Sequence, residues 1–171
     1  MAAGIPAGAM ATLTMDIAMV AAARYGGSTF SSDRLSPQVI GRWAAALMRG
    51  RLRHRDIMDE PARRGELPLG IATHYATGIA LTEAFVLLRP RLGSRRRGGK
   101  SGFLESVAYG MATATLPLLI LFPSLGYGWF ARRSGETARL NRAMVLGHAA
   151  FGIGIGLWVP YFARRRGDFP R

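Results

Sequence analysis

The sequence predicts an all-α protein, a four-helix transmembrane bundle with a short interfacial amphipathic helix between the first and second spans. Two observations predict this class. Four long stretches of the 171-residue chain are almost free of charge, while its 23 Lys and Arg residues fall almost wholly between those stretches. The stretches also lack the polar face that a water-exposed helix shows at every third or fourth position. We therefore expect residues 1–171 to form a single integral membrane domain.

The positions of the spans follow from length. A helix rises about 1.5 Å per residue, so crossing a hydrocarbon core of roughly 30 Å takes about 20 mostly apolar residues. Asp16 and Glu83 are the only charged residues inside the segments that meet this length. We expect spans at about residues 2–23, 67–88, 106–130 and 143–162.

Two further features refine the bundle. Pro117 lies inside the third span, where a proline removes a helical hydrogen bond, so we expect a kink there. Residues 37–48 are too few to cross a bilayer, but Val39, Ile40 and Trp43 within them have helical spacing. This spacing predicts an amphipathic helix at about 37–48 that lies in the membrane interface.

The formal net charge of +13 is open to two interpretations. Clustered cations neutralise phosphates in nucleic-acid-binding proteins. Here the cations occupy loops beside apolar spans, as membrane insertion and anionic lipid head groups favour, and no nucleic-acid-recognition motif accompanies them. We expect a lipid bilayer as the partner and no nucleic acid. The absence of cysteine excludes disulfides, thiolate metal sites and cysteine nucleophiles.

The distribution of cations also predicts an orientation, because Lys and Arg in short loops are retained in the cytoplasm. The loop between the first two spans carries nine Arg residues, and no Lys or Arg precedes Arg24. We therefore expect both termini to lie outside and the first and third loops to be cytoplasmic.

Three ionisable groups inside the spans require an explanation, because a charge near the bilayer midplane costs about 2.5–3.5 kcal/mol on insertion scales. They are Asp16, His74 and His148. Counted from the span ends beside the first and third loops, Asp16 and His74 lie seven residues deep and His148 lies five residues deep. These positions correspond to depths of roughly 8–10 Å. The three groups are therefore expected to share one layer.

Small residues flank each of these groups at helical spacing, which indicates that each faces a neighbouring helix instead of lipid. Gly70 and Gly78 bracket His74, Gly152 and Gly156 follow His148, and Thr12, Gly8 and Gly4 precede Asp16. Polar groups at one depth that face inward predict either a binding site or a hydrogen-bonded cluster that only fixes the packing.

Two imidazoles and a carboxylate suit a small ligand, an ion or a proton. His74 and His148 are also candidate ligands of a metal ion or of haem iron, although neither spacing is diagnostic. No catalytic residue is identifiable in the sequence, which favours a binding or structural role over an enzymatic one.

The basic segment after the interfacial helix is a second candidate site. Arg51, Arg53 and His54 are candidates for contact with an anionic head group or a phosphate, since Arg forms bidentate contacts with such oxygens. The alternative is that the segment serves only as a cytoplasmic anchor.

Glu83 and Glu105 lie near the opposite membrane face, at the end of the second span and the start of the third. We interpret both as interfacial charges that pair with Arg89 or Arg91.

Short motifs along the chain carry a family resemblance. They are Met15-Asp16, Gly41-Arg42-Trp43, Gly50-Arg51 with His54, Gly65-Glu66 followed by His74-Tyr75 and Gly78, Pro123 with Gly126 and Gly128, and Arg142 with His148, Phe151-Gly152 and Gly154. Together they resemble the bacterial inner-membrane family catalogued as domain of unknown function 2938, over almost the whole chain. The resemblance implies a four-helix protein of the bacterial inner membrane, and it supplies no reaction.

Three functional hypotheses follow. The first is a bacterial inner-membrane protein that binds a small ligand, an ion or a proton at Asp16, His74 and His148. The second is an accessory or structural subunit of a larger membrane complex, or a homo-oligomer, that docks through its glycine faces. The third is a metal- or haem-binding membrane enzyme.

Overall fold

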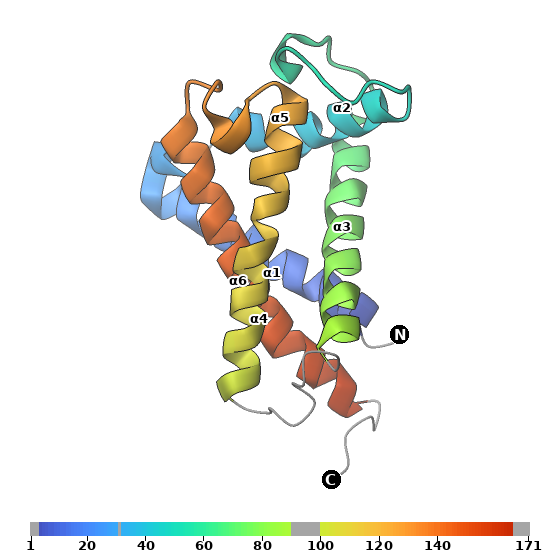
Figure 1. Cartoon of the computed structure of the whole chain (residues 1–171), viewed down its shortest axis with the longest axis vertical. Coiled ribbons are helices and arrows are strands. Elements are labelled where there is room, and N and C mark those ends of the chain that lie inside the picture. Colours follow the sequence, from blue (N-terminus) through green and yellow to red (C-terminus); the bar gives the residue numbers. More distant parts are fainter. Residues whose placement is uncertain (1–3, 31, 90–99, 166–171) are drawn as a thin grey trace. The chain divides into compact units, whose positions relative to one another are not determined.

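The computed structural model describes residues 4–30, 32–89 and 100–165, and within these ranges the secondary structure is entirely helical (Figure 1). The long helices are α1 (Gly4–Gly26), α3 (Glu66–Leu88), α4 (Lys100–Thr113) and α6 (Thr137–Arg165). The short helix α2 (Pro37–Leu47) lies between α1 and α3 in the chain, and α5 (Phe122–Leu125) follows α4. The predicted all-α class and the short helix between the first two spans are confirmed.

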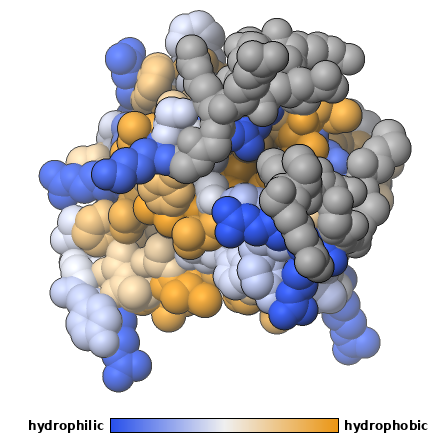
Figure 2. Space-filling view, turned by 90° about the horizontal axis from the view of Figure 1, so that it is seen from below, coloured by the Kyte–Doolittle hydropathy of each residue, from blue (hydrophilic) through white to orange (hydrophobic). Residues whose placement is uncertain are grey.

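Four helical segments are long and apolar enough to cross a membrane: Gly4–Gly26, Glu66–Leu88, Lys100–Leu125 and Thr137–Arg165. Large apolar side chains such as Ile17 and Val20 on α1 are exposed, as expected where lipid is the solvent. Figure 2 shows one face on which apolar residues are widespread and long hydrophilic side chains project at the edge.

The ends of the third span differ from the sequence prediction. The helix begins at Lys100 and ends at Leu125, whereas the prediction was about 106–130. It ends there because Gly126 has a positive φ of 91°, which closes the helix. The irregularity expected at Pro117 is a π-helical turn, Pro117–Leu121, because proline cannot donate the regular helical hydrogen bond. Most of the basic second loop, residues 90–99, lies outside the described residues.

The chain packs as two compact units, both built from separate stretches of sequence. Unit 1 comprises Met1–Ala18, Tyr75–Thr113 and Leu146–Arg171, and unit 2 comprises Met19–His74 and Ala114–Val145. Unit 1 therefore contains segments of all four long helices. Unit 2 contains the first and third loops with the helix ends that they join, so these two loops lie together as the topology predicts.

Helices in unit 1 approach one another until their backbones nearly touch. A Cβ atom at Gly8 of α1 would lie 2.7 Å from the Cα of Ile79 on α3. A Cβ at Gly154 of α6 would lie 2.7 Å from the Cα of Ala11. A Cβ at Gly110 of α4 would overlap the backbone of α6. The glycine faces that the sequence predicts against neighbouring helices are thus used inside this chain.

Unit 2 combines close helix crossing with buried ion pairs. Helix α2 meets the start of α3 at Gly41 and Gly70, where a Cβ on either glycine would overlap the other helix's backbone. Beside this crossing, the guanidinium of Arg42 donates to the carboxylate of Glu66 at 3.0 and 3.2 Å from Nε and at 3.0 Å from Nη2. Both side chains are largely buried, with exposed fractions of 14% and 5%.

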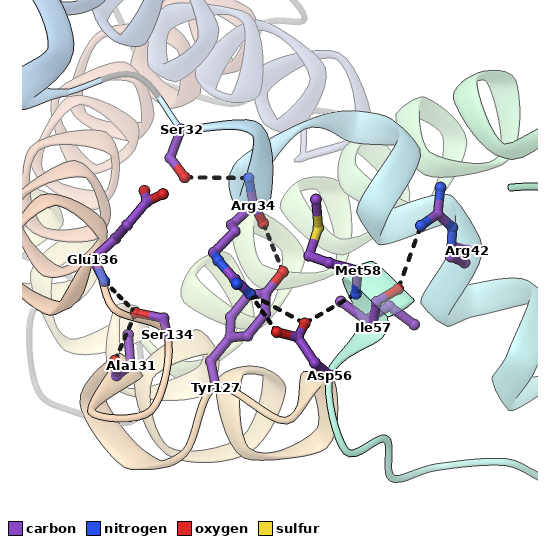
Figure 3. Close-up of polar contacts among 10 residues, drawn as sticks. All are labelled: Ser32, Arg34, Arg42, Asp56, Ile57, Met58, Tyr127, Ala131, Ser134 and Glu136. Atoms are coloured by element: carbon purple, nitrogen blue, oxygen red, sulfur yellow. Dashed lines mark hydrogen bonds and ion pairs between the residues drawn. The ribbon is translucent and has the colours of Figure 1, made fainter. Parts of the chain in front are cut away.

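A second ion pair, Arg34–Asp56, lies within the first loop and contacts Tyr127 of the third loop, as Figure 3 shows. Arg34 donates to Asp56 at 2.9 and 3.1 Å, and its guanidinium lies 4.8 Å from the ring centre of Tyr127. Burial disfavours the charged form of Arg34, but the hydrogen bonds and the charge of Asp56, together with Tyr127, outweigh it and raise the pKa of Arg34. The apolar core around these residues contains Val39, Ile57, Ala114, Leu118, Phe122, Leu125, Tyr127, Ala131 and Leu140.

Candidate functional site

Asp16 carries the charge inside the first span, and its carboxylate faces another helix of unit 1. The hydroxyl of Tyr75 on α3 donates a hydrogen bond to Oδ2 of Asp16 at 3.0 Å. This bond explains why the side chain of Asp16 points toward α3, because a carboxylate surrounded by apolar side chains requires hydrogen-bond donors. The side chain is partly exposed at the surface of the unit.

His148 on α6 is buried, with 8% of its surface exposed. Its Nδ1 lies 2.9 Å from Oγ1 of Thr113 on α4, and the same hydroxyl lies 2.7 Å from the carbonyl oxygen of Gly110. A carbonyl oxygen can only accept, so the Thr113 hydroxyl donates to Gly110 and accepts from Nδ1–H of His148. In the neutral imidazole this leaves Nε2 as the nitrogen with the lone pair.

These four residues, Asp16, Tyr75, Thr113 and His148, define what we call the polar layer. Unit 1 consists of three chain segments, and four of the segment ends are Ala18, Tyr75, Thr113 and Leu146. Each residue of the polar layer is one of these ends or lies two residues from one. All four residues thus lie near the boundaries of unit 1 along the chain. The shared depth of Asp16 and His148 stays a prediction.

Two further hydrogen bonds join the helices of unit 1. The indole Nε1 of Trp158 on α6 donates to Oγ1 of Thr14 on α1 at 3.1 Å. The hydroxyl of Tyr109 on α4 donates to the carbonyl oxygen of Leu81 on α3 at 2.7 Å. With the two bonds of the polar layer, α1–α3, α3–α4, α4–α6 and α6–α1 are each joined by at least one polar contact.

His74 is the third residue of the predicted site and immediately precedes Tyr75 on α3. It is half-buried and forms the end of the α3 segment that belongs to unit 2. Over residues 4–30, 32–89 and 100–165, no group of three or more His, Cys, Asp or Glu side chains is arranged to hold a metal ion. A metal or haem site that uses only His74 and His148 stays a prediction.

His54, predicted as a head-group contact, points into unit 2. Its side chain has no exposed surface, and its Nδ1 lies 3.3 Å from Oε1 of Glu60. Arg51 contacts the same carboxylate at 2.5 and 3.2 Å. Hydrogen bonds from Arg51, and then from His54, lower the pKa of Glu60. The imidazole Nε2 is buried and has no hydrogen-bond partner among the residues that the structure describes.

Glu83 and Glu105, which the sequence predicts near the opposite membrane face, both belong to unit 1. Nε of Arg89 lies 3.4 Å from Oε2 of Glu105, which confirms the predicted pairing of Glu105 with Arg89. The carboxylate of Glu83 lies against Gly4, where any Cβ would overlap it. Gly4 is the first residue of α1, so this carboxylate lies where a helix N-terminus favours negative charge.

Sequence reasoning missed the partners of the polar layer, Tyr75 and Thr113. A hydroxyl side chain in an apolar span is a weak signal, because threonine often donates to its own helix, as Thr12 does to the carbonyl oxygen of Gly8. Tyr75 gives a stronger signal, since a phenol at the depth of Asp16 needs an acceptor.

Residues 5–162 match the model of a family described as "Protein of unknown function (DUF2938)". No curated protein and no solved structure matches the chain.

Proposed function

Because the chain belongs to the DUF2938 family, whose description supplies no activity, we propose from the geometry alone that it is a membrane protein that binds a small cation or a proton at the polar layer. Asp16 is the charged ligand in this proposal and His148 is the second ligand. His74, next to Tyr75 in the chain, is the third candidate.

The observation that carries this proposal is the aspartate inside an apolar span. Asp16 accepts a hydrogen bond from the hydroxyl of Tyr75, which is a neutral donor. Ionisable groups inside membrane spans commonly mark ion or proton pathways because they are costly there. A cation or a proton bound at Asp16 would neutralise its carboxylate inside the span.

The hydrogen-bond pattern favours a cation over an anion. Asp16 offers carboxylate oxygens, which accept, and neutral His148 with its proton on Nδ1 has its lone pair on Nε2. Both groups therefore present acceptors, which suit a proton or a metal cation and repel an anion.

The test compares Asp16→Asn with the wild-type protein in detergent. Asparagine retains an oxygen that accepts from Tyr75 and loses the charge, so in choline the variant should keep the wild-type melting temperature. We expect the wild-type melting temperature to change with pH or on replacing choline by Na⁺ or K⁺ at constant ionic strength. Asp16→Asn should remove that response.

Two outcomes would overturn the proposal: a wild-type protein with no response to pH or to either cation, or a variant that keeps the full response. His148→Asn and His74→Asn test the other two ligands in the same assay. Loss of stability without loss of the response would assign these residues to packing. Iron or zinc in stoichiometric amount would instead favour the metal-binding enzyme, and a co-purifying protein the accessory subunit.

We propose that the protein lies in the bacterial inner membrane with both termini outside. The nine Arg residues of the first loop support a cytoplasmic position for unit 2's loops. Because the chain has no cysteine, Arg53→Cys and Ser101→Cys can each carry a single thiol-reactive label. An impermeant maleimide should label Ser101→Cys in intact cells and Arg53→Cys only after permeabilisation. The reverse pattern would invert the orientation.

The basic segment supports a separate proposal, contact with anionic head groups. Exposed Arg53 follows two exposed apolar side chains, since Met48 is 72% and Leu52 is 51% exposed. Arg51 is half-exposed while it pairs with Glu60. In this proposal Arg51 and Arg53 make the contacts, and His54 positions them through Glu60. Arg53→Gln should weaken binding of the detergent-purified protein to anionic lipid; unchanged binding would refute the contact.

A further inference from the structure

A groove of about 270 Å³ runs along the outside of unit 1 between α3 and α4. Its volume is close to the lower end for pockets that hold small molecules. The lining is almost entirely apolar apart from one charged pair. It consists of Phe85, Leu88, Arg89, Glu105, Ala108, Tyr109 and Ala112.

Small residues on α4 create the hollow. Ala108 and Ala112 are one helical turn apart, both are exposed, and their methyl groups leave the groove open between larger neighbours. The rings of Phe85 and Tyr109, with centres 5.1 Å apart, form its inner wall. Both α3 and α4 belong to segments apolar enough to cross a bilayer, so lipid acyl chains are the molecules that meet this surface.

One end of the groove carries both signs of charge. Arg89 and Glu105 lie 3.4 Å apart, and each side chain keeps about a quarter of its surface exposed, at 25% and 26%. Arg89 follows Phe85 by one turn, and Glu105 precedes Tyr109 by one turn. The apolar part of the groove therefore extends away from the charged pair along both helices.

We propose that this groove binds a phospholipid with a phosphoethanolamine head group. One acyl chain lies over Ala108 and Ala112. The Arg89 guanidinium donates to the phosphate oxygens, and the primary ammonium donates to the Glu105 carboxylate. The charges at the groove end are the complement of this zwitterion.

The charged pair also discriminates against other phospholipids. The quaternary ammonium of phosphatidylcholine has no N–H to donate to Glu105. Phosphatidylglycerol has no cation to oppose the carboxylate. Both lipids would keep the phosphate contact with Arg89 and the acyl-chain contact, so we expect weaker binding and not its absence.

Native mass spectrometry of the full chain, delipidated in detergent and then given one lipid at a time, tests the proposal. Wild-type protein should retain phosphatidylethanolamine roughly tenfold more tightly than phosphatidylcholine, as expected for one hydrogen bond to a charged group. Ala112→Leu should reduce binding of every lipid because its side chain fills the groove. Ala80→Leu is the matched control: Ala80 is exposed on α3 and outside the groove lining, so this variant should bind as the wild type does.

Glu105→Gln tests the head-group contact without filling the groove. We expect it to bring phosphatidylethanolamine binding close to that of phosphatidylcholine. If Ala112→Leu does not fold, Ala108→Val partly fills the same hollow with a smaller side chain. Equal wild-type binding of the two lipids would overturn the proposal. So would unchanged binding by the filled-groove variant, or a preference for phosphatidylglycerol.

Discussion

The two units of this chain are stabilised by different chemistry. In unit 1, glycine lets α4 and α6 approach until their backbones nearly touch, and most of the polar contacts between helices join hydroxyl, indole and imidazole groups. In unit 2, an apolar core surrounds ion pairs, of which Arg42–Glu66 is the most buried. Both units contain segments of the spans, and unit 2 also contains the first and third loops.

Apolar side chains gain little by leaving lipid for a protein interior, so helices there associate through close packing and hydrogen bonds. The loops of unit 2 extend beyond the spans, where burial of apolar surface from water does stabilise a fold. Comparing substitutions in the two units can therefore separate the two kinds of stabilisation.

The largest effect is expected in unit 2, for Arg42→Ala. This change leaves the carboxylate of Glu66 buried without its main partner, since only 5% of that side chain is exposed. Breaking a buried ion pair from one side costs about 3–5 kcal/mol. The measurement is the free energy of unfolding from titration with sodium dodecyl sulfate in mixed micelles.

Arg51→Ala provides the control for Arg42→Ala, because Arg51 pairs with Glu60 in the same unit but is 51% exposed. Exposed ion pairs contribute about 0–1 kcal/mol. Equal losses for the two variants would show that burial does not determine the strength of the pairs in unit 2.

A smaller loss is expected in unit 1 for Gly110→Ala. In an unobstructed helix this change would stabilise, since alanine has the higher helix propensity. Here the new methyl group would overlap the backbone of Gly152, so α4 and α6 must separate. Overpacking of this kind costs about 1–3 kcal/mol. Met111→Ala, at the exposed neighbouring position, should cost less in the same titration. Stabilisation by Gly110→Ala would refute the close approach.

The sequence predicted the four spans but not where their helices end. Hydropathy marks the part of a helix that suits lipid, whereas the helix itself continues while its backbone hydrogen bonds do. Helix α6 thus begins at Thr137, before the predicted start at 143, and the third span begins at Lys100. Its other end is fixed by the positive φ of Gly126, a backbone property that hydropathy does not measure.

For the candidate site, the sequence likewise predicted some features and not others. Depth along a helix can be counted, so the sequence could place Asp16 and His148 toward one end of the bundle. Which residue each would contact depends on how neighbouring helices are rotated, and no count gives that rotation. Tyr75 and Thr113 therefore emerged only from the structure. The burial of His54 was missed for a related reason, because its partner Glu60 is brought near by an irregular loop.

The smallest effect we predict is on the change of melting temperature with pH. It compares the Arg51–Glu60 pair of unit 2 with another ion pair of the same unit. Arg51 and then His54 lower the pKa of Glu60 in the folded protein, so the unfolded chain binds the proton more readily. The stabilisation is therefore complete above the ordinary pKa of 4.5 and is lost as the pH falls through the lowered value.

Glu60→Gln should reduce the loss of melting temperature on acidification from about pH 5.5 to about pH 3.5. Glu136→Gln, which removes a half-exposed pair with Arg139, is the control and should leave the acid response as it is in the wild type. An unchanged acid response in Glu60→Gln would mean that the Arg51–Glu60–His54 cluster does not contribute to the stability of unit 2.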